Sequence, residues 1–200
     1  MLCVPCLLLM FAGPFWVDKM PKEWTDIELS QIFVESPWSQ PLSAPARSAV
    51  PSPSVPIYLA TAAPMAEAEM ERARRLKVRR KGPEDEDPLE EDYRAWLEDN
   101  HTTQIVVAIR LGLNQKLSDA AEMKHMEDEC YMQVGHKKVK MSGHFPPTQR
   151  DPYLRIAFAR QPLEDEKVVI FVIYVPGLPI PVREVQFKVK DLMLNGKPEL

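Results

Sequence analysis

The chain has few glycines, few cysteines and no strong excess of one charge. Its 200 residues include 7 glycines and 3 cysteines, and the formal net charge at pH 7 is -4. The glycines do not form a phosphate-binding loop. A weakly charged chain also lacks the overall field that brings basic proteins to nucleic acid. We therefore expect no nucleic-acid partner.

No charged side chain occurs in residues 1–17, and the centre of this segment, residues 7–12, is apolar. This pattern is typical of a signal peptide, and we predict a leader over residues 1–17. Because the segment is short and contains internal prolines, removal of the leader is favoured over a retained membrane anchor, although retention stays open. Cys3 and Cys6 form a CxxC pair inside this leader, so its removal leaves Cys130 without a disulfide partner.

Proline is abundant, with 20 residues, and it alternates with serine and alanine between residues 39 and 56. Such a composition favours an extended linker. Before it, residues 18–38 form a predicted N-terminal helical segment, in which Thr25 and Glu28 have the spacing of a capping box. We expect this segment to pack on the body of the protein. Residues 57–200 are predicted to fold as one domain.

Within this domain, the hydrophobic pattern predicts helices over residues 65–81, 88–100 and 118–128. Strands are predicted over residues 57–59 and 104–111, and a hairpin over residues 131–141. Three further strand-like runs occupy residues 153–159, 168–175 and 182–190. The expected fold class is α+β, with an antiparallel sheet, a C-terminal three-strand meander and about four helices.

Soft metal ligands are concentrated between Met123 and His144: they are Met123, His125, Met126, Cys130, Met132, His136, Met141 and His144. This set would suit copper or zinc, or a metal- or cysteine-dependent hydrolase. The spacing matches no zinc finger, however, and methionine commonly fills gaps in a core. We therefore assign no catalytic, cofactor-binding or metal-ligating residue from the sequence, and we keep the metal site and the hydrolase as the alternative function.

Two other features have both a structural and a functional interpretation. The basic run Arg72–Lys81 resembles a nucleic-acid patch, but an acidic block over residues 84–92 follows it, so a self-neutralised surface helix is favoured. Trp16, Trp24 and Trp38 form either the contact of the N-terminal helix with the body or a site for a protein partner, and packing is favoured.

Several short motifs carry a resemblance to a known group of proteins. They are Glu23-Trp24-Thr25-Asp26-Ile27-Glu28, Ser36-Pro37-Trp38, Tyr58-Leu59 leading into Ala62-Ala63-Pro64-Met65, Phe158-Ala159-Arg160, and the closing run Phe187–Leu200. With these, the chain resembles an unnamed family of exported bacterial proteins of unknown function. It departs from the family at Ala60-Thr61 and at Pro198. The resemblance implies export and brings no activity with it.

The sequence therefore predicts a periplasmic or secreted protein that acts by binding or as a structural component. It has no recognisable catalytic motif, no assigned cofactor and no transmembrane span once the leader is removed. A protein partner is the candidate ligand.

Overall fold

The computed structural model describes residues 13–45, 54–79, 88–112, 115–163 and 165–200. In this part of the chain the α-helices are α1 (Phe15–Asp18), α2 (Asp26–Glu35), α3 (Ala63–Arg79), α4 (Pro88–Asn100) and α5 (Ala120–Glu129). Short 3-10 helices occupy Pro21–Glu23, Gln115–Ser118 and Val189–Leu192. No described helix has the length and apolarity needed to cross a membrane.

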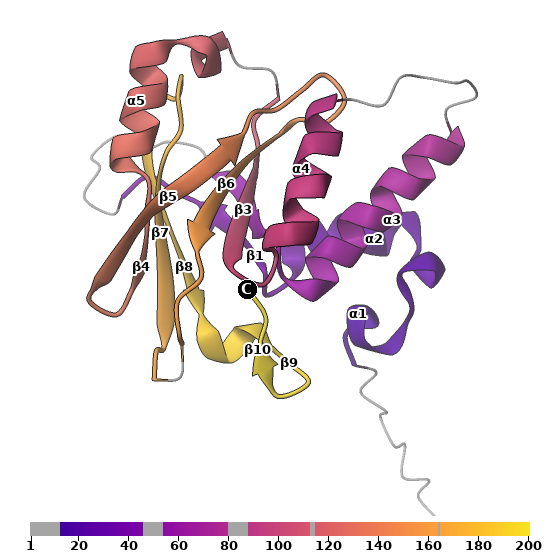
Figure 1. The fold of residues 1–200 in the computed structure, drawn as a ribbon. Coiled ribbons are helices and arrows are strands. Elements are labelled where there is room, and N and C mark those ends of the chain that lie inside the picture. Colours follow the sequence, from indigo (N-terminus) through magenta and orange to yellow (C-terminus); the bar gives the residue numbers. More distant parts are fainter. Residues whose placement is uncertain (1–12, 46–53, 80–87, 113–114, 164) are drawn as a thin grey trace, which may run out of the picture.

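The main sheet has eight antiparallel strands in the order β1-β2-β3-β6-β5-β4-β7-β8. The strands are β1 (Ser39–Leu42), β2 (Val55–Leu59), β3 (Gln104–Arg110), β4 (Tyr131–Val134), β5 (Lys137–Phe145), β6 (Tyr153–Ala159), β7 (Val168–Tyr174) and β8 (Val182–Lys188). A bridge between Ser43 and Glu184 brings the two ends of this sheet together. The sheet is therefore curled and nearly closed (Figure 1). A separate small hairpin consists of β9 (Met193–Leu194) and β10 (Lys197–Pro198).

The predicted α+β class and antiparallel sheet are confirmed. The three C-terminal runs are strands β6, β7 and β8, but only β7 and β8 pair with each other. β6 pairs with β3 and β5, and the β4–β5 hairpin lies between β6 and β7, so the three strands do not form a simple meander. The alternation of side chains along a strand predicts which of its faces is buried. It does not predict which other strand will pair with it. Phe158 of β6 and Phe171 of β7 still meet, with ring centroids 5.4 Å apart.

The segment predicted as a linker is partly strand. Residues 39–42 form β1 and residues 55–56 begin β2, while residues 46–53 lie outside the described part. β1 is the first strand in the sheet order, where a proline without an N–H donor is tolerated, and Pro41 lies opposite Pro56. Leu42 is fully buried, so β1 belongs to the folded body.

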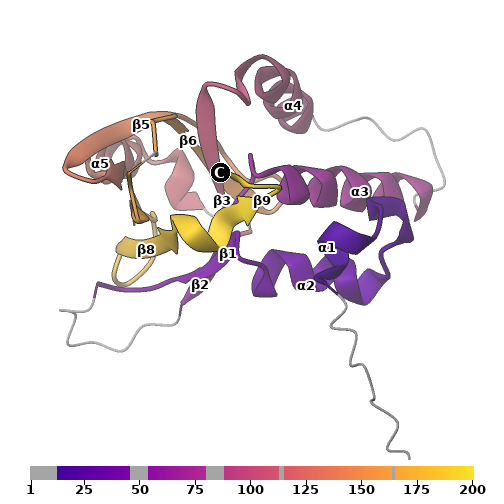
Figure 2. The same ribbon diagram turned by 90° about the horizontal axis from the view of Figure 1, so that it is seen from below.

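Helix α2 begins at the predicted capping box. Glu28 N donates to Thr25 Oγ1 at 3.1 Å, and Thr25 N donates to Glu28 Oε2 at 2.7 Å, which completes the capping box. Leu29, Ile32 and Phe33 are buried against the body. The N-terminal helical segment therefore packs on the domain; Figure 2 shows α1 and α2 together with α3 at one side of the sheet.

The tryptophans take part in this packing. Trp24 and Trp38 are almost fully buried, and the Trp16 and Trp38 ring centroids lie 6.0 Å apart. Phe15 contacts Trp24 at 5.5 Å. Phe15 and Trp16 lie within the predicted leader, residues 1–12 of which are outside the described part. The described end of this segment therefore contacts the folded domain.

Candidate functional site

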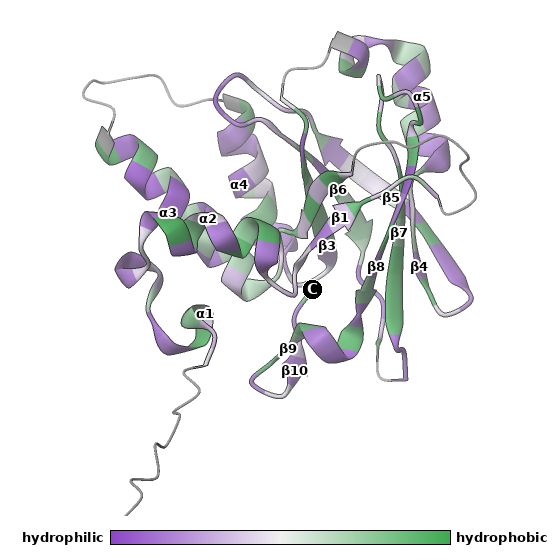
Figure 3. Ribbon diagram, turned by 180° about the vertical axis from the view of Figure 1, so that it is seen from behind, coloured by the Kyte–Doolittle hydropathy of each residue, from purple (hydrophilic) through white to green (hydrophobic). Residues whose placement is uncertain are grey.

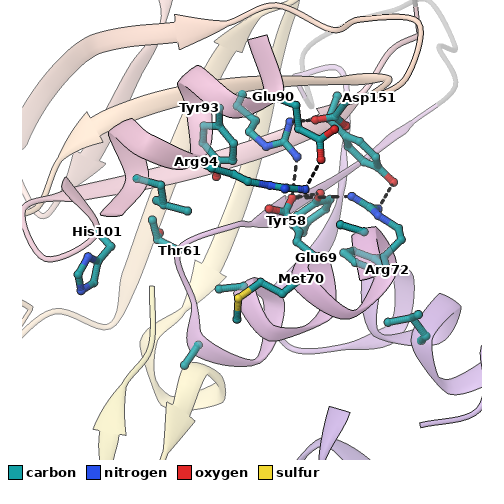
Figure 4. A pocket seen from close by; sticks show the side chains of 18 of the residues that line it. Tyr58, Thr61, Glu69, Met70, Arg72, Glu90, Tyr93, Arg94, His101 and Asp151 are labelled. Atoms are coloured by element: carbon teal, nitrogen blue, oxygen red, sulfur yellow. Dashed lines mark hydrogen bonds and ion pairs between the residues drawn. The ribbon is translucent and has the colours of Figure 1, made fainter. Parts of the chain in front are cut away.

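A cleft of about 1970 Å³ lies between α3, α4 and one face of the sheet. Figure 4 shows its floor, with side chains from both helices and from the sheet directed towards one another. In the sheet, Tyr58 and Arg155 both lie opposite Ala108, and Tyr153 lies opposite Arg110. Because side chains alternate along a strand, these residues share one face, which is the floor of the cleft.

Buried ion pairs connect the floor to α3. Arg155 is 5% exposed; its Nη2 donates to Glu69 Oε1 at 3.0 Å, and its Nη1 donates to Asp151 Oδ2. The Tyr58 hydroxyl donates to Glu69 Oε1 at 2.6 Å. Arg72 of α3 donates from Nη1 to the Tyr153 hydroxyl at 2.9 Å. The two arginines are thus matched by two carboxylates.

Aromatic rings alternate with these guanidinium groups. The Arg72 Cζ lies 4.4 Å from the centroid of the Phe33 ring and 4.6 Å from that of Tyr153. The Arg155 Cζ lies 4.3 Å from the Tyr93 centroid and 5.7 Å from the Tyr153 centroid. We call Phe33, Arg72, Tyr153, Arg155 and Tyr93 the arginine–aromatic ladder. It joins α2, α3, β6 and α4, and cation–π contacts of this kind are favourable when they are shielded from water.

Three titratable groups of the floor, Glu69, Tyr58 and Tyr93, have pKa values that their surroundings shift further from neutrality. Burial raises the pKa of Glu69, but the charges of Arg155 and Arg72 more than offset it, so the net pKa is lowered. Burial raises the pKa of Tyr58 and of Tyr93. At neutral pH, Glu69 is ionised and the tyrosines are protonated. A general acid or base works best with a pKa near the working pH, and these groups do not meet that requirement.

The rim of the cleft has a different character. Val34, Met70 and Leu76 line it while being 56%, 66% and 41% exposed. The α3 wall also presents the small side chains of Ala66 and Ala73. Apolar side chains gathered at an open cleft are typical of a surface that contacts another molecule. Figure 3 shows apolar residues on α2 and α3 among polar ones.

Cys130 is buried at the end of α5, away from this cleft. The Tyr174 backbone N–H donates to its Sγ at 3.2 Å, and burial raises the pKa of the thiol to about 12. A thiol that stays protonated is a poor nucleophile. His125 of α5 stacks on the Tyr174 ring, with centroids 5.7 Å apart.

The other histidines are spread out. His136 is exposed in the hairpin turn, and His144 lies near the far end of β5. Eight residues of extended chain separate them by about 26 Å. Met126 and Met132 are fully buried in the core. Among the described residues, no three or more His, Cys, Asp or Glu side chains are arranged to hold a metal ion. The metal-site and hydrolase alternative stays a prediction that these positions do not support.

Three members of the basic run on α3, namely Arg72, Arg74 and Arg75, are paired within the protein. Arg74 and Arg75 both donate to Glu71, and Arg75 also donates to Asp26 Oδ1 at 2.8 Å and to the Trp24 carbonyl oxygen at 2.6 Å. Residues 80–87, which include the end of the run and part of the acidic block, lie outside the described part.

The sequence did not predict that the floor residues form a site. One signal was available: Arg155 interrupts the apolar strand Tyr153–Ala159, and a charge in a buried strand requires a partner. The sequence could not predict which residue is that partner, because Glu69 lies 86 residues away along the chain.

In comparisons with known proteins, no family model, no curated protein and no solved structure matches this chain. The resemblance to exported bacterial proteins remains a prediction from the motifs quoted above.

Proposed function

We propose that this chain is an exported binding protein without enzymatic activity, and that the cleft between α3 and α4 receives a polypeptide segment of a partner. The observation that carries this proposal is the open cleft with exposed Met70 and Leu76 on one wall. An apolar groove beside a helix is a common receptor for a peptide.

The size of the cleft favours a polypeptide over a small molecule. Small-molecule sites usually occupy about 300–1,000 Å³, whereas this cleft measures about 1970 Å³. A helix about 10 Å wide that rises 1.5 Å per residue fills about 120 Å³ per residue. The cleft therefore matches the volume of about 16 helical residues.

The arginine–aromatic ladder supports binding in a second way. It fixes both helices to β6. α3 is joined through Arg72 on Tyr153 and Glu69 on Arg155, and α4 is joined through Tyr93 on Arg155. Walls that are fixed in advance reduce the ordering cost of association. The lowered pKa of Glu69 and the raised pKa of Tyr58 also suit a structural floor better than proton transfer.

Binding can be tested with the protein as bait in an envelope extract of the source organism. Met70→Glu places a charge on the cleft wall, whereas Ile27→Glu changes a residue that is 71% exposed on α2 and does not line the cleft. We expect a protein that the wild type and Ile27→Glu retain and Met70→Glu loses, as quantified by mass spectrometry. Identical retention by all three would contradict the proposal.

Export is proposed from the apolar leader and the family resemblance. Cleavage after Val17 would remove Phe15 and Trp16, whose rings contact Trp24 and Trp38. We therefore expect the mature chain to begin before Phe15. Fractionation of cells followed by N-terminal sequencing tests both points, and an intact chain in the cytoplasmic fraction would contradict export.

A further inference from the structure

The lining of the cleft is more basic than the chain as a whole. Nine Lys or Arg residues and seven Asp or Glu residues line the cleft. The whole chain has 25 basic and 29 acidic residues, so its overall balance has the opposite sign. A concave surface with a local excess of one charge, on a protein whose net charge has the other sign, favours ligands of complementary charge.

Two basic residues of this lining lie at the Tyr153 end of the floor. Arg110 lies directly opposite Tyr153, and Arg150 precedes Tyr153 by three residues; both arginines are exposed and line the cleft. The two carboxylates of the floor, Glu69 and Asp151, are already bonded to Arg155. Within the described residues, neither Arg110 nor Arg150 forms an ion pair, whereas Arg72 and Arg155 do.

We infer that the partner segment is acidic and amphipathic, with carboxylates against Arg110 and Arg150 and apolar side chains against Met70 and Leu76. This inference rests on the proposed function. The arrangement is consistent along α3, because Arg72 stacks on Tyr153 and Leu76 lies one helical turn further along the same helix. The segment would thus reach the basic end and the apolar wall together.

Three labelled peptides of 16 residues test the charge of the ligand. They share the same amphipathic pattern of leucines and carry Glu, Gln or Lys at every polar position. We expect the Glu peptide to bind the full-length protein most tightly and the Lys peptide most weakly, as measured by fluorescence anisotropy. The advantage of the Glu peptide should shrink as salt is raised from 50 to about 500 mM, because exposed charges are screened.

Charge reversal tests the location. The double variant Arg110→Glu/Arg150→Glu should weaken binding of the Glu peptide about tenfold or more, since two exposed attractions become repulsions. The control Lys124→Glu/Lys188→Glu reverses two exposed lysines that do not line the cleft. It makes the same change in net charge and should leave the affinity within about twofold of wild type.

If the Glu peptide binds no tighter than the Gln and Lys peptides, or if both double variants weaken it equally, the inference is wrong. A partner whose capture depends on Met70 would still support the proposed function in that case. Conversely, if Met70→Glu captures the same proteins as the wild type, the proposed function itself is contradicted.

Discussion

Replacing Arg155 by methionine removes the charge at the centre of the arginine–aromatic ladder while keeping much of the side-chain volume. The Arg155 and Glu69 side chains are only 6% and 12% exposed. The substitution leaves Glu69 and Asp151 without their strongest partner in a buried setting. Breaking a buried ion pair in this way costs about 3–5 kcal/mol of unfolding free energy, and for a chain of this size we expect a fall in Tm of about 6–20 °C.

The assay is urea unfolding followed by tryptophan fluorescence and by circular dichroism, which must give coincident transitions. The matched control is Arg94→Met, because the Arg94–Glu90 pair connects side chains that are 43% and 30% exposed. Losing such an exposed pair should cost less than about 1 kcal/mol.

The double variant Glu69→Gln/Arg155→Met distinguishes the energy of the ion pair from the energy of side-chain packing. Because it removes both charges, its loss of unfolding free energy should be smaller than the sum of the losses in the two single variants, by about 1 kcal/mol or more. If Arg155→Met costs no more than Arg94→Met, or if the two floor substitutions are additive, the ladder does not hold the helices on the sheet as we reason.

Three further predictions concern other parts of the molecule. Cys130, with a pKa raised to about 12 by burial, should resist iodoacetamide at pH 8 in the folded protein and react after unfolding in urea; rapid labelling of the native chain would show that the thiol is accessible. Glu71 has a pKa lowered to about 2, first by its hydrogen bond with Arg74. Its stabilisation is therefore present above the unfolded value near 4.3 and is lost as pH falls towards 2, so Glu71→Gln should be less acid-sensitive than wild type in urea unfolding at pH 7 and pH 3. Deleting Leu200, which is 1% exposed, should lower the unfolding free energy by about 2–3 kcal/mol; an unchanged Tm in calorimetry would contradict that.

Local signals in the sequence predicted the individual elements well. The capping box at Thr25 and Glu28 marked the start of α2, and the β4–β5 hairpin forms within the predicted residues 131–141, with its turn at Gly135. Gly135 has φ 57°, a conformation that favours glycine. Each of these features depends on residues within a few positions of one another, so the chain itself contains the information.

The tertiary structure decided which elements meet. Proline content predicted a linker where β1 forms, because the pairing of Pro41 with Pro56 at the first strand of the sheet is not a local property. The Trp38 Nε1 donates to the Glu199 carbonyl oxygen at 3.0 Å across 161 residues of sequence. The candidate site has the same origin, since Glu69 and Arg155 meet only when α3 packs on β6.

The sequence by itself thus determined the α+β class, the start of α2 and most strands, because short-range hydrogen bonding and hydrophobic periodicity establish these locally. Only the tertiary structure decided the strand order, the near-closure of the sheet and the cleft. Side-chain periodicity sets which face of a strand is buried and leaves its neighbours undetermined, and a buried charge such as Arg155 reveals its need for a partner without naming it.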